Sequence, residues 1–224
     1  MSTFELALVI LAAAALWGGF FYWRRQVREK RREALGQVAT EMRWSFASDA
    51  DDTLRTSMGN FRLFAHGRSK RFRNLMRGSG DNAGAALFDY AYTVGGGKER
   101  HTHRQTVLSL NVAGRPLPHF CLRPEHVWDK VEAFFGHKDI NLEAHPDFSK
   151  AYSLRGDDEY QIRNFFSERL IAFIESERGI TMEGDGSTLI LYRHRKLIKP
   201  AEIRSFIEME IGRASCRERV YGPV

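Results

Sequence analysis

The chain has 224 residues, of which 43% are hydrophobic and 28% charged, with a formal net charge of +6 and two cysteines. This composition excludes an intrinsically disordered chain and a small secreted fold held together by disulfides. The positive charge does not by itself indicate a nucleic-acid partner, because residues 24–33 alone carry six basic and two acidic side chains.

An uncharged, apolar run extends from Leu6 to Trp23, and the basic residues follow it directly. As a helix this run would be about 27 Å long, close to the hydrocarbon thickness of a bilayer. It therefore predicts a transmembrane helix over residues 6–23. The alternatives are a cleaved signal peptide and a buried helix of a soluble protein. A signal peptide carries positive charge before its apolar core, whereas the charged side chain that precedes this run is Glu5.

The basic residues after the run predict the topology, because cationic side chains beside a span are retained on the cytoplasmic side. We expect a single-pass protein with its N-terminus outside and everything after Trp23 in the cytoplasm. Apolar residues at helical spacing from Val27 to Met42 predict that the helix continues as a basic juxtamembrane helix over residues 24–44. Trp44 and Phe46 should then pack onto the domain that follows.

Residues 45–209 predict one cytoplasmic α+β domain, large enough for a single hydrophobic core. A short helix over residues 52–58, capped by Asp49 or Asp51, should precede an antiparallel β meander with one buried face. The strands of this meander are expected over residues 61–66, 71–76, 85–94 and 105–112. Residues 117–122 should add an edge strand, because Pro116 and Pro118 lack the N–H that a central strand donates.

Helical patterns dominate the rest of the chain. Residues 124–136 predict one helix, and two more are expected after Asp157 and Ser167, whose side chains can cap them. The turn residues Gly184–Gly186 predict a hairpin, and Pro200 should begin a final helix. These last elements would form a C-terminal ββα unit.

The segment from Glu210 to Val220 matches the conceptual translation of a short-read sequencing adapter over eleven codons. We therefore expect residues 210–224 not to be native, and we assign no role to Cys216. The alternative is a genuine basic tail that contains a thiol. If the tail is excluded, Cys121 is the remaining cysteine, which predicts no intramolecular disulfide and fits a reducing cytoplasm.

Two histidines provide the candidate metal ligands. His101 and His103 are two residues apart, so on a strand both imidazoles would point to the same side, and Asp89 on the neighbouring strand could supply an oxygen ligand. Two histidines without a placed third ligand are weak support for zinc, and solvent-exposed histidines in a hairpin are the favoured interpretation. We therefore expect no metal and no other cofactor.

Three further patterns have structural explanations. Gly95–Lys98 lacks the spacing of a phosphate-binding loop and predicts a hairpin tip. Cys121 lies near His119 and His126 in the sequence, but a buried thiol is a simpler interpretation than a Cys–His nucleophile. The acidic residues 157–159 are placed to begin a helix. No catalytic residue is predicted, so an enzyme is not the favoured interpretation.

Residues 61–77 are basic without any acidic residue, and Phe64 and Phe72 lie among the cations. Such a patch could hold RNA through phosphate contacts and base stacking, could lie on anionic lipid, or could be a solvated hairpin face. The neighbouring membrane anchor favours lipid over nucleic acid. The candidate contact residues are Arg24, Arg25, Arg28, Arg31, Arg32, Arg68, Lys70, Arg71 and Arg73.

Five segments are recognisable in combination: Leu87–Thr93 (LFDYAYT), Leu117–Glu125 (LPHFCLRPE), Phe135–Ile140 (FGHKDI), Pro146–Ser149 (PDFS) and Tyr152–Glu159 (YSLRGDDE). With them, the chain resembles an uncharacterised group of bacterial single-span membrane proteins that share a domain of unknown function. The resemblance implies a location in the bacterial inner membrane and this architecture. It brings no catalytic or binding residues.

These features lead to one favoured hypothesis and two alternatives. The favoured one is a non-enzymatic protein-interaction or scaffolding module in the membrane that binds a protein partner or a second copy of itself. The first alternative is peripheral contact with anionic lipid or RNA through residues 62–77. The second is a metal-dependent hydrolase that uses His101, His103 and Asp89.

Overall fold

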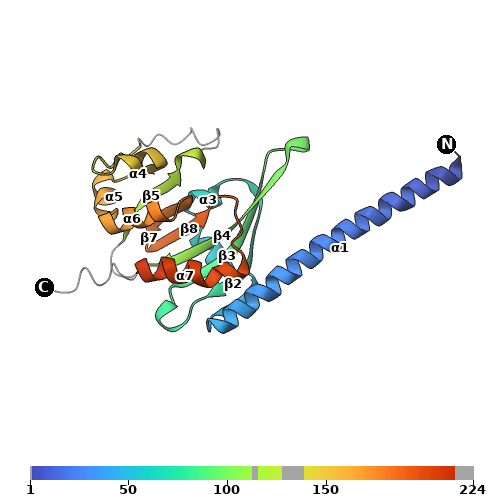
Figure 1. The fold of residues 1–224 in the computed structure, drawn as a ribbon, viewed down its shortest axis with the longest axis horizontal. Coiled ribbons are helices and arrows are strands. Elements are labelled where there is room, and N and C mark those ends of the chain that lie inside the picture. Colours follow the sequence, from blue (N-terminus) through green and yellow to red (C-terminus); the bar gives the residue numbers. More distant parts are fainter. Residues whose placement is uncertain (1, 113–115, 128–138, 215–224) are drawn as a thin grey trace.

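The computed structural model describes residues 2–112, 116–127 and 139–214. Within these ranges the chain forms an α+β fold, built on an eight-stranded antiparallel sheet with the strand order β1-β2-β3-β4-β8-β7-β5-β6. Figure 1 shows the sheet with a long helix, α1, that extends away from it toward the N-terminus. The predicted fold class is confirmed.

Helix α1 (Thr3–Glu41) is continuous from the apolar run into the domain, as predicted. Its N-terminus has a capping box, in which the Ser2 hydroxyl accepts a hydrogen bond from the Glu5 N–H and the Glu5 carboxylate accepts one from the Ser2 N–H. The helix is long and apolar enough to cross a membrane, a test that a signal sequence would also pass. Near its other end Leu35 and Ala39 are fully buried in the core.

Three short elements follow α1: β1 (Ser45–Asp49), α2 (Asp52–Ser57) and α3 (Arg62–Ala65). The Asp51 side chain caps α2 by accepting from the Leu54 N–H at 2.8 Å, so Asp51 rather than Asp49 is the cap. The prediction of a strand over residues 61–66 is wrong, because residues 62–65 of this segment form the helix α3. Phe61 and Phe64 are three residues apart, and a helical turn places both rings, 6.5 Å from each other, against the sheet.

The predicted meander is present as β2 (Arg68–Arg77), β3 (Ala85–Val94) and β4 (His101–Asn111). The 3₁₀ turns η1 (Gly80–Asn82) and η2 (Gly97–Glu99) connect these strands. Strand β2 has two register shifts, and Ser69 and Asn74 in them have positive φ angles of 53°. These shifts change the twist of β2 without ending the strand.

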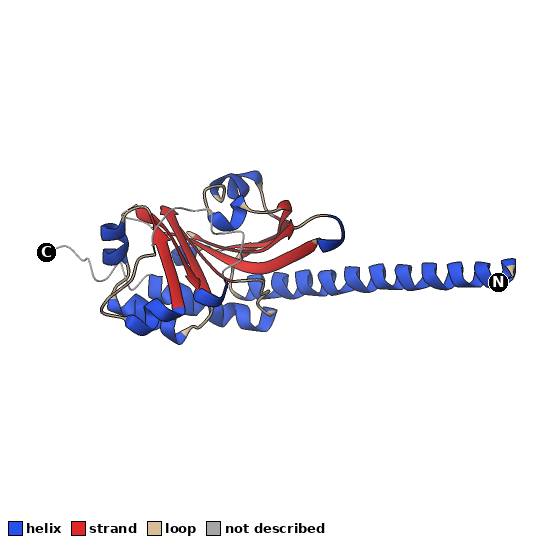
Figure 2. Cartoon of the chain, turned by 90° about the horizontal axis from the view of Figure 1, so that it is seen from above, coloured by secondary structure: helices blue, strands red, loops and turns tan. Residues whose placement is uncertain are grey.

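The sheet has two buried faces, which corrects the prediction of one. In the β3–β4 register Leu87 pairs with Leu108, and Phe88 pairs with Val107. The leucine pair belongs to a core under α1 and α7, whereas the Phe88 pair belongs to a second core under α2 and α3. Figure 2 shows helices on both sides of the sheet. Alternate side chains of β3 and β4 therefore point into two different apolar cores, rather than into one core and into solvent.

The other half of the sheet contains β5 (Leu117–Pro124), β6 (Tyr152–Gly156), β7 (Ile180–Gly186) and β8 (Thr188–Arg193). Strand β5 lies between β7 and β6, so the predicted edge strand is an internal one. A register shift between Leu117 and Phe120 spans Pro118, which has no N–H to donate. The predicted hairpin is confirmed as β7–β8, and it turns through Gly186 and Ser187.

The remaining helices are η3 (Glu125–Val127), α4 (Pro146–Ala151), α5 (Glu159–Phe165), α6 (Glu168–Ser176) and α7 (Pro200–Ala214). Helices α5, α6 and α7 confirm three predicted helices, and Asp158 rather than Asp157 caps α5. The helix predicted over residues 124–136 lies outside the described residues beyond Val127. Of the segment 210–224, which we predicted not to be native, residues 210–214 belong to α7 and the rest is outside the described residues.

Candidate functional site

The junction between α1 and the sheet is built around Arg31. Its Nε and Nη2 atoms donate to the two Asp89 carboxylate oxygens at 2.7 and 2.8 Å, a bidentate ion pair. Arg31 also donates to the Thr106 hydroxyl at 3.1 Å and to the Ile198 carbonyl at 2.8 Å. Asp89 accepts further bonds from Asn74 at 2.8 Å and Thr106 at 3.0 Å. The side chains of Arg31 and Asp89 are 17% and 11% exposed, so this junction is largely desolvated.

This arrangement changes the interpretation of two predicted site residues. Arg31 was a candidate contact for lipid and Asp89 a candidate metal ligand, but each is the other's ion-pair partner. Arg31 lies four residues after Val27 and four before Leu35, on the apolar stripe of α1. An arginine among the apolar residues that face the domain needs a buried anion as its partner, so this position could have indicated an ion pair from the sequence.

The two candidate histidines lie on the other face of the sheet from Asp89. His103 pairs with Tyr92 and His101 with Val94, whereas Asp89 pairs with Thr106. Since alternate residues of a strand point to opposite faces, the histidines and Asp89 do not converge. The His103 ring instead lies 5.3 Å from that of Tyr92. No group of three or more metal-ligating side chains is found among the described residues.

A cluster of arginines lies next to the junction, on the same face of the sheet as Asp89. Arg71 on β2 and Arg104 on β4 flank Ala91 of β3 in one row across the three strands, and Arg73 pairs with Asp89 in the next row. The pKa of Arg104 is lowered, first by burial and then by repulsion from Arg24 and Arg28 of α1 and from Arg73 and Arg71. We call Arg24, Arg28, Arg71, Arg73 and Arg104 the arginine cluster.

The other predicted basic residues lie elsewhere or have partners. Arg25 and Arg32 are exposed on α1, and Arg32 forms an ion pair of 2.8 Å with Glu29. Arg68 donates to the Gly95 carbonyl at 2.6 Å, and Lys70 donates to the Ala65 carbonyl at 3.3 Å. Arg68 and Lys70 therefore fasten neighbouring segments to β2.

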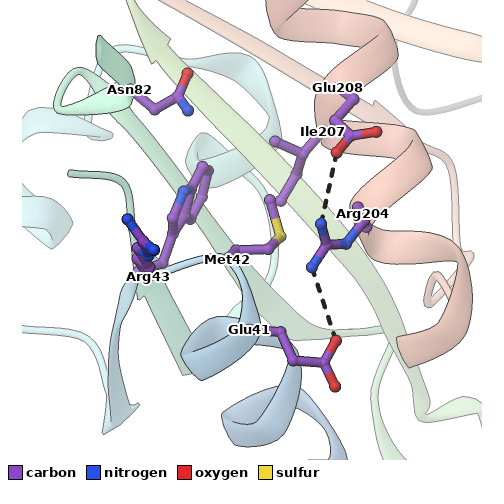
Figure 3. Close-up of a pocket in the computed structure, with 8 residues that line it drawn as sticks. Glu41, Met42, Arg43, Asn82, Arg204, Ile207 and Glu208 are labelled. Atoms are coloured by element: carbon purple, nitrogen blue, oxygen red, sulfur yellow. Dashed lines mark ion pairs between the residues drawn. The ribbon is translucent and has the colours of Figure 1, made fainter. Parts of the chain in front are cut away.

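A groove of about 380 Å³ lies where α1 ends, between that end and α7. Arg204 of α7 lies between Glu41 and Glu208, at 3.8 and 3.9 Å, and Figure 3 shows these ion pairs beside Met42 and Ile207. The lining combines both charge signs with a small apolar strip. Both carboxylates of the lining are paired with Arg204, and none of the lining residues is a Ser, Cys, Thr or Lys nucleophile.

A buried polar group that the sequence did not reveal surrounds Glu183 on β7. Glu183 is 2% exposed, and it accepts a hydrogen bond from the Tyr192 hydroxyl at 2.7 Å. Arg123 lies 3.7 Å away, and the Leu63 N–H of α3 donates to the other carboxylate oxygen at 3.4 Å. Burial raises the pKa of Tyr192, and the neighbouring Glu183 adds to this effect. The group ties α3 to the sheet.

Cys121 lies beside Glu183 in the β5–β7 register and is buried. Burial, followed by the repulsion from Glu183, raises the pKa of its thiol to about 12. Only a thiolate is an effective nucleophile, so a Cys–His nucleophile is not supported. His119, one of the two nearby histidines, instead makes a 2.9 Å contact with Asp157.

The burial of Cys121 leads to a labelling prediction. At pH 8 the native thiol should resist iodoacetamide, because its raised pKa keeps it protonated and the fold keeps it inaccessible. After denaturation in urea the same thiol should react readily. Peptide mass spectrometry measures modification at Cys121 in both samples. Rapid modification of the native protein at this position would contradict the assignment.

No protein-family model matches the chain, and no curated protein matches it. Among solved structures, the crystal structure of the mycobacterial trehalose monomycolate transport factor A, TtfA, is similar in fold. The TM-score is 0.58, and the match covers 88% of this chain and 97% of that one at 12% sequence identity. At that identity the likeness shows a shared fold alone.

Proposed function

We propose that this chain is a non-enzymatic accessory module of the bacterial inner membrane, anchored by α1 with its N-terminus outside. Its α+β domain is held in the cytoplasm in a fixed orientation, where it binds a protein partner or a second copy of the chain. The observation that carries the proposal is the ion pair between Arg31 and Asp89, which joins the anchor helix directly to the sheet.

The way α1 enters the domain supports a rigid display. The helix continues without a break from the apolar run to Glu41, and Leu35 and Ala39 are fully buried in the core. If the anchor served only to localise the domain, a flexible polar linker would be sufficient. A helix that shares the core of the domain transmits its own orientation, which is useful when the partner lies in or on the same membrane.

The shared fold supports an accessory role, because the similar solved structure is that of a transport factor. The hydrolase alternative has less support, because Asp89 is already paired with Arg31 and lies on the opposite face from His101 and His103. The resemblance to bacterial single-span proteins agrees with the anchor and with this location.

The test is cross-linking in native bacterial membranes, followed by identification of the adducts. The decisive variant carries four flexible residues between Gln26 and Val27, which would separate the apolar segment from Arg31 while leaving the domain intact. We expect the wild type to give a reproducible adduct with a membrane protein or with itself. The variant should lose that adduct while it remains in the membrane fraction.

The control carries the same four residues between Glu143 and Ala144, an exposed turn just before α4, and Figure 1 shows α4 well away from α1. This control should cross-link as the wild type does. The rigid-display proposal fails if neither protein gives an adduct, or if the insertion in α1 leaves the adduct unchanged. The anchor itself is wrong if alkaline carbonate extracts the wild type from membranes.

A further inference from the structure

We propose that the arginine cluster is a binding site for the phosphate group of an anionic phospholipid. The site goes beyond the protein-binding role above, because it needs no protein partner. Three elements contribute to it: α1 with Arg24 and Arg28, β2 with Arg71 and Arg73, and β4 with Arg104. Arg104 lies close enough to the other four for each of them to lower its pKa.

The residues on the sheet carry the inference. Basic residues directly after an apolar span are explained by membrane topology alone, so Arg24 and Arg28 would need no further role. Arg71, Arg73 and Arg104 are far from the span in sequence and contribute nothing to that topology. The fold nevertheless places them beside the basic turns of α1, where like charges repel. A bound anion would offset this repulsion.

The cluster has few protein anions of its own. Among the described residues, no ion pair involves Arg24, Arg28, Arg71, Arg73 or Arg104. Both oxygens of Asp89 are occupied by Arg31, and Asp49 lies opposite Arg73 on the edge strand β1. The cluster is therefore strongly positive.

The row across the sheet also has a suitable shape. Ala91 lies between Arg71 and Arg104, and the outer strands of three neighbouring strands are about 10 Å apart. The short alanine side chain leaves space between the two guanidinium groups, each of which can donate two parallel hydrogen bonds to phosphate oxygens. A phosphate group above Ala91 would be contacted from both sides.

The position along α1 indicates a lipid as the source of this phosphate. Arg24 follows the apolar run directly, and Arg28 is about 6 Å farther along the helix, within the depth of the headgroup layer. In Figures 1 and 2 the β3–β4 hairpin extends in the same direction as the N-terminal part of α1. The cluster therefore lies on the part of the domain nearest the apolar segment.

RNA is the less suitable ligand. Binding of single-stranded RNA by such a patch would use base stacking on exposed aromatic rings. Phe64 and Phe72, which lie among the cations in the sequence, are buried in the core on the opposite face of the sheet. Neither of these two rings is therefore available to stack on a base beside the cluster.

The experiment uses the full chain in a non-ionic detergent and dioctanoyl phosphatidylglycerol as the probe, with binding measured by native mass spectrometry and microscale thermophoresis. The variant is Arg71→Gln with Arg104→Gln, which removes both cations beside Ala91. We expect about 30-fold weaker binding, from two membrane-adjacent charges. The control, Arg169→Gln with Arg178→Gln, makes the same charge change at exposed positions on and after α6 and should bind as the wild type does.

Dioctanoyl phosphatidylcholine should bind much more weakly than phosphatidylglycerol, and about 1 M salt, where the Debye length is about 3 Å, should weaken phosphatidylglycerol binding to the wild type. Removal of repelling charges should not lower the melting temperature. Arg71→Lys with Arg104→Lys keeps the charges but loses the paired donors, so it should bind more tightly than the glutamine variant and more weakly than the wild type. The proposal is overturned if the glutamine variant binds like the wild type or the two lipids bind equally. It is also overturned if inorganic phosphate or an RNA oligonucleotide binds as tightly as the anionic lipid.

Discussion

Replacement of Asp89 by alanine is expected to lower the free energy of unfolding by about 3–5 kcal/mol, because it leaves the Arg31 guanidinium desolvated without its carboxylate. Asn74 and Thr106 also lose their shared acceptor. The measurement is denaturant unfolding of the detergent-solubilised chain, followed by the circular dichroism of the sheet. Hydrogen exchange should show a selective loss of protection in the part of α1 around Leu35, since this junction holds it on the sheet.

Two further variants test whether the loss of stability comes from the Arg31–Asp89 pair. Arg32→Ala removes an exposed ion pair with Glu29 on the same helix and should change the stability by less than about 1 kcal/mol. The double variant Arg31→Met with Asp89→Ala should be more stable than Asp89→Ala alone, because no unpaired charge remains. If Asp89→Ala and Arg32→Ala have similar effects, the Arg31–Asp89 pair does not hold the helix on the sheet.

The second large effect is expected for Tyr90→Ala, which should cost about 3–5 kcal/mol of unfolding free energy. Tyr90 is fully buried in the core under α2 and α3, with its ring 4.7 Å from that of Phe64 and 4.8 Å from that of Phe72. The loss of the ring would leave a cavity between α3 and the sheet. Thermal and denaturant unfolding measure this loss.

Tyr90→Phe is the matched control, because it keeps the ring and removes only the hydroxyl. That hydroxyl is buried and has no hydrogen-bond partner among the described residues, and burial raises its pKa. Removal of an unpaired buried hydroxyl should leave the stability unchanged or raise it slightly. A phenylalanine variant as unstable as the alanine variant would show that the hydroxyl has a partner.

The local elements of this protein could be predicted where one sequence signal acted alone. Periodicity predicted α1 and the β3–β4 hairpin, and a capping residue followed by an apolar stripe predicted α5 and α6. The segment 61–66 was mispredicted, because a short aromatic run fits a strand or one helical turn equally well. Strand β6 was not predicted, because Tyr152–Gly156 is short and its pairing with β5 is a long-range contact.

The candidate site, too, was predictable from local sequence only in part, because its residues come together through long-range contacts. The basic residues after the apolar run and those of β2 were visible as separate groups in the sequence, and the lipid interpretation followed from both. Arg104 was not recognised, because nothing in its local sequence distinguishes it from other basic residues of a strand. The pairing of Ala91 with Arg71 and Arg104 brings these groups together.

The sequence alone determined the long apolar segment, the basic flank and the α+β class, because each depends on the composition or spacing of neighbouring residues. The tertiary structure decided the partner of Asp89, the two-sided core and the arginine cluster. These depend on strand register, and a shift of one residue would have turned Asp89 away from Arg31 and exchanged the two faces of the sheet. Register is set by the packing of the whole domain, and no single segment encodes it.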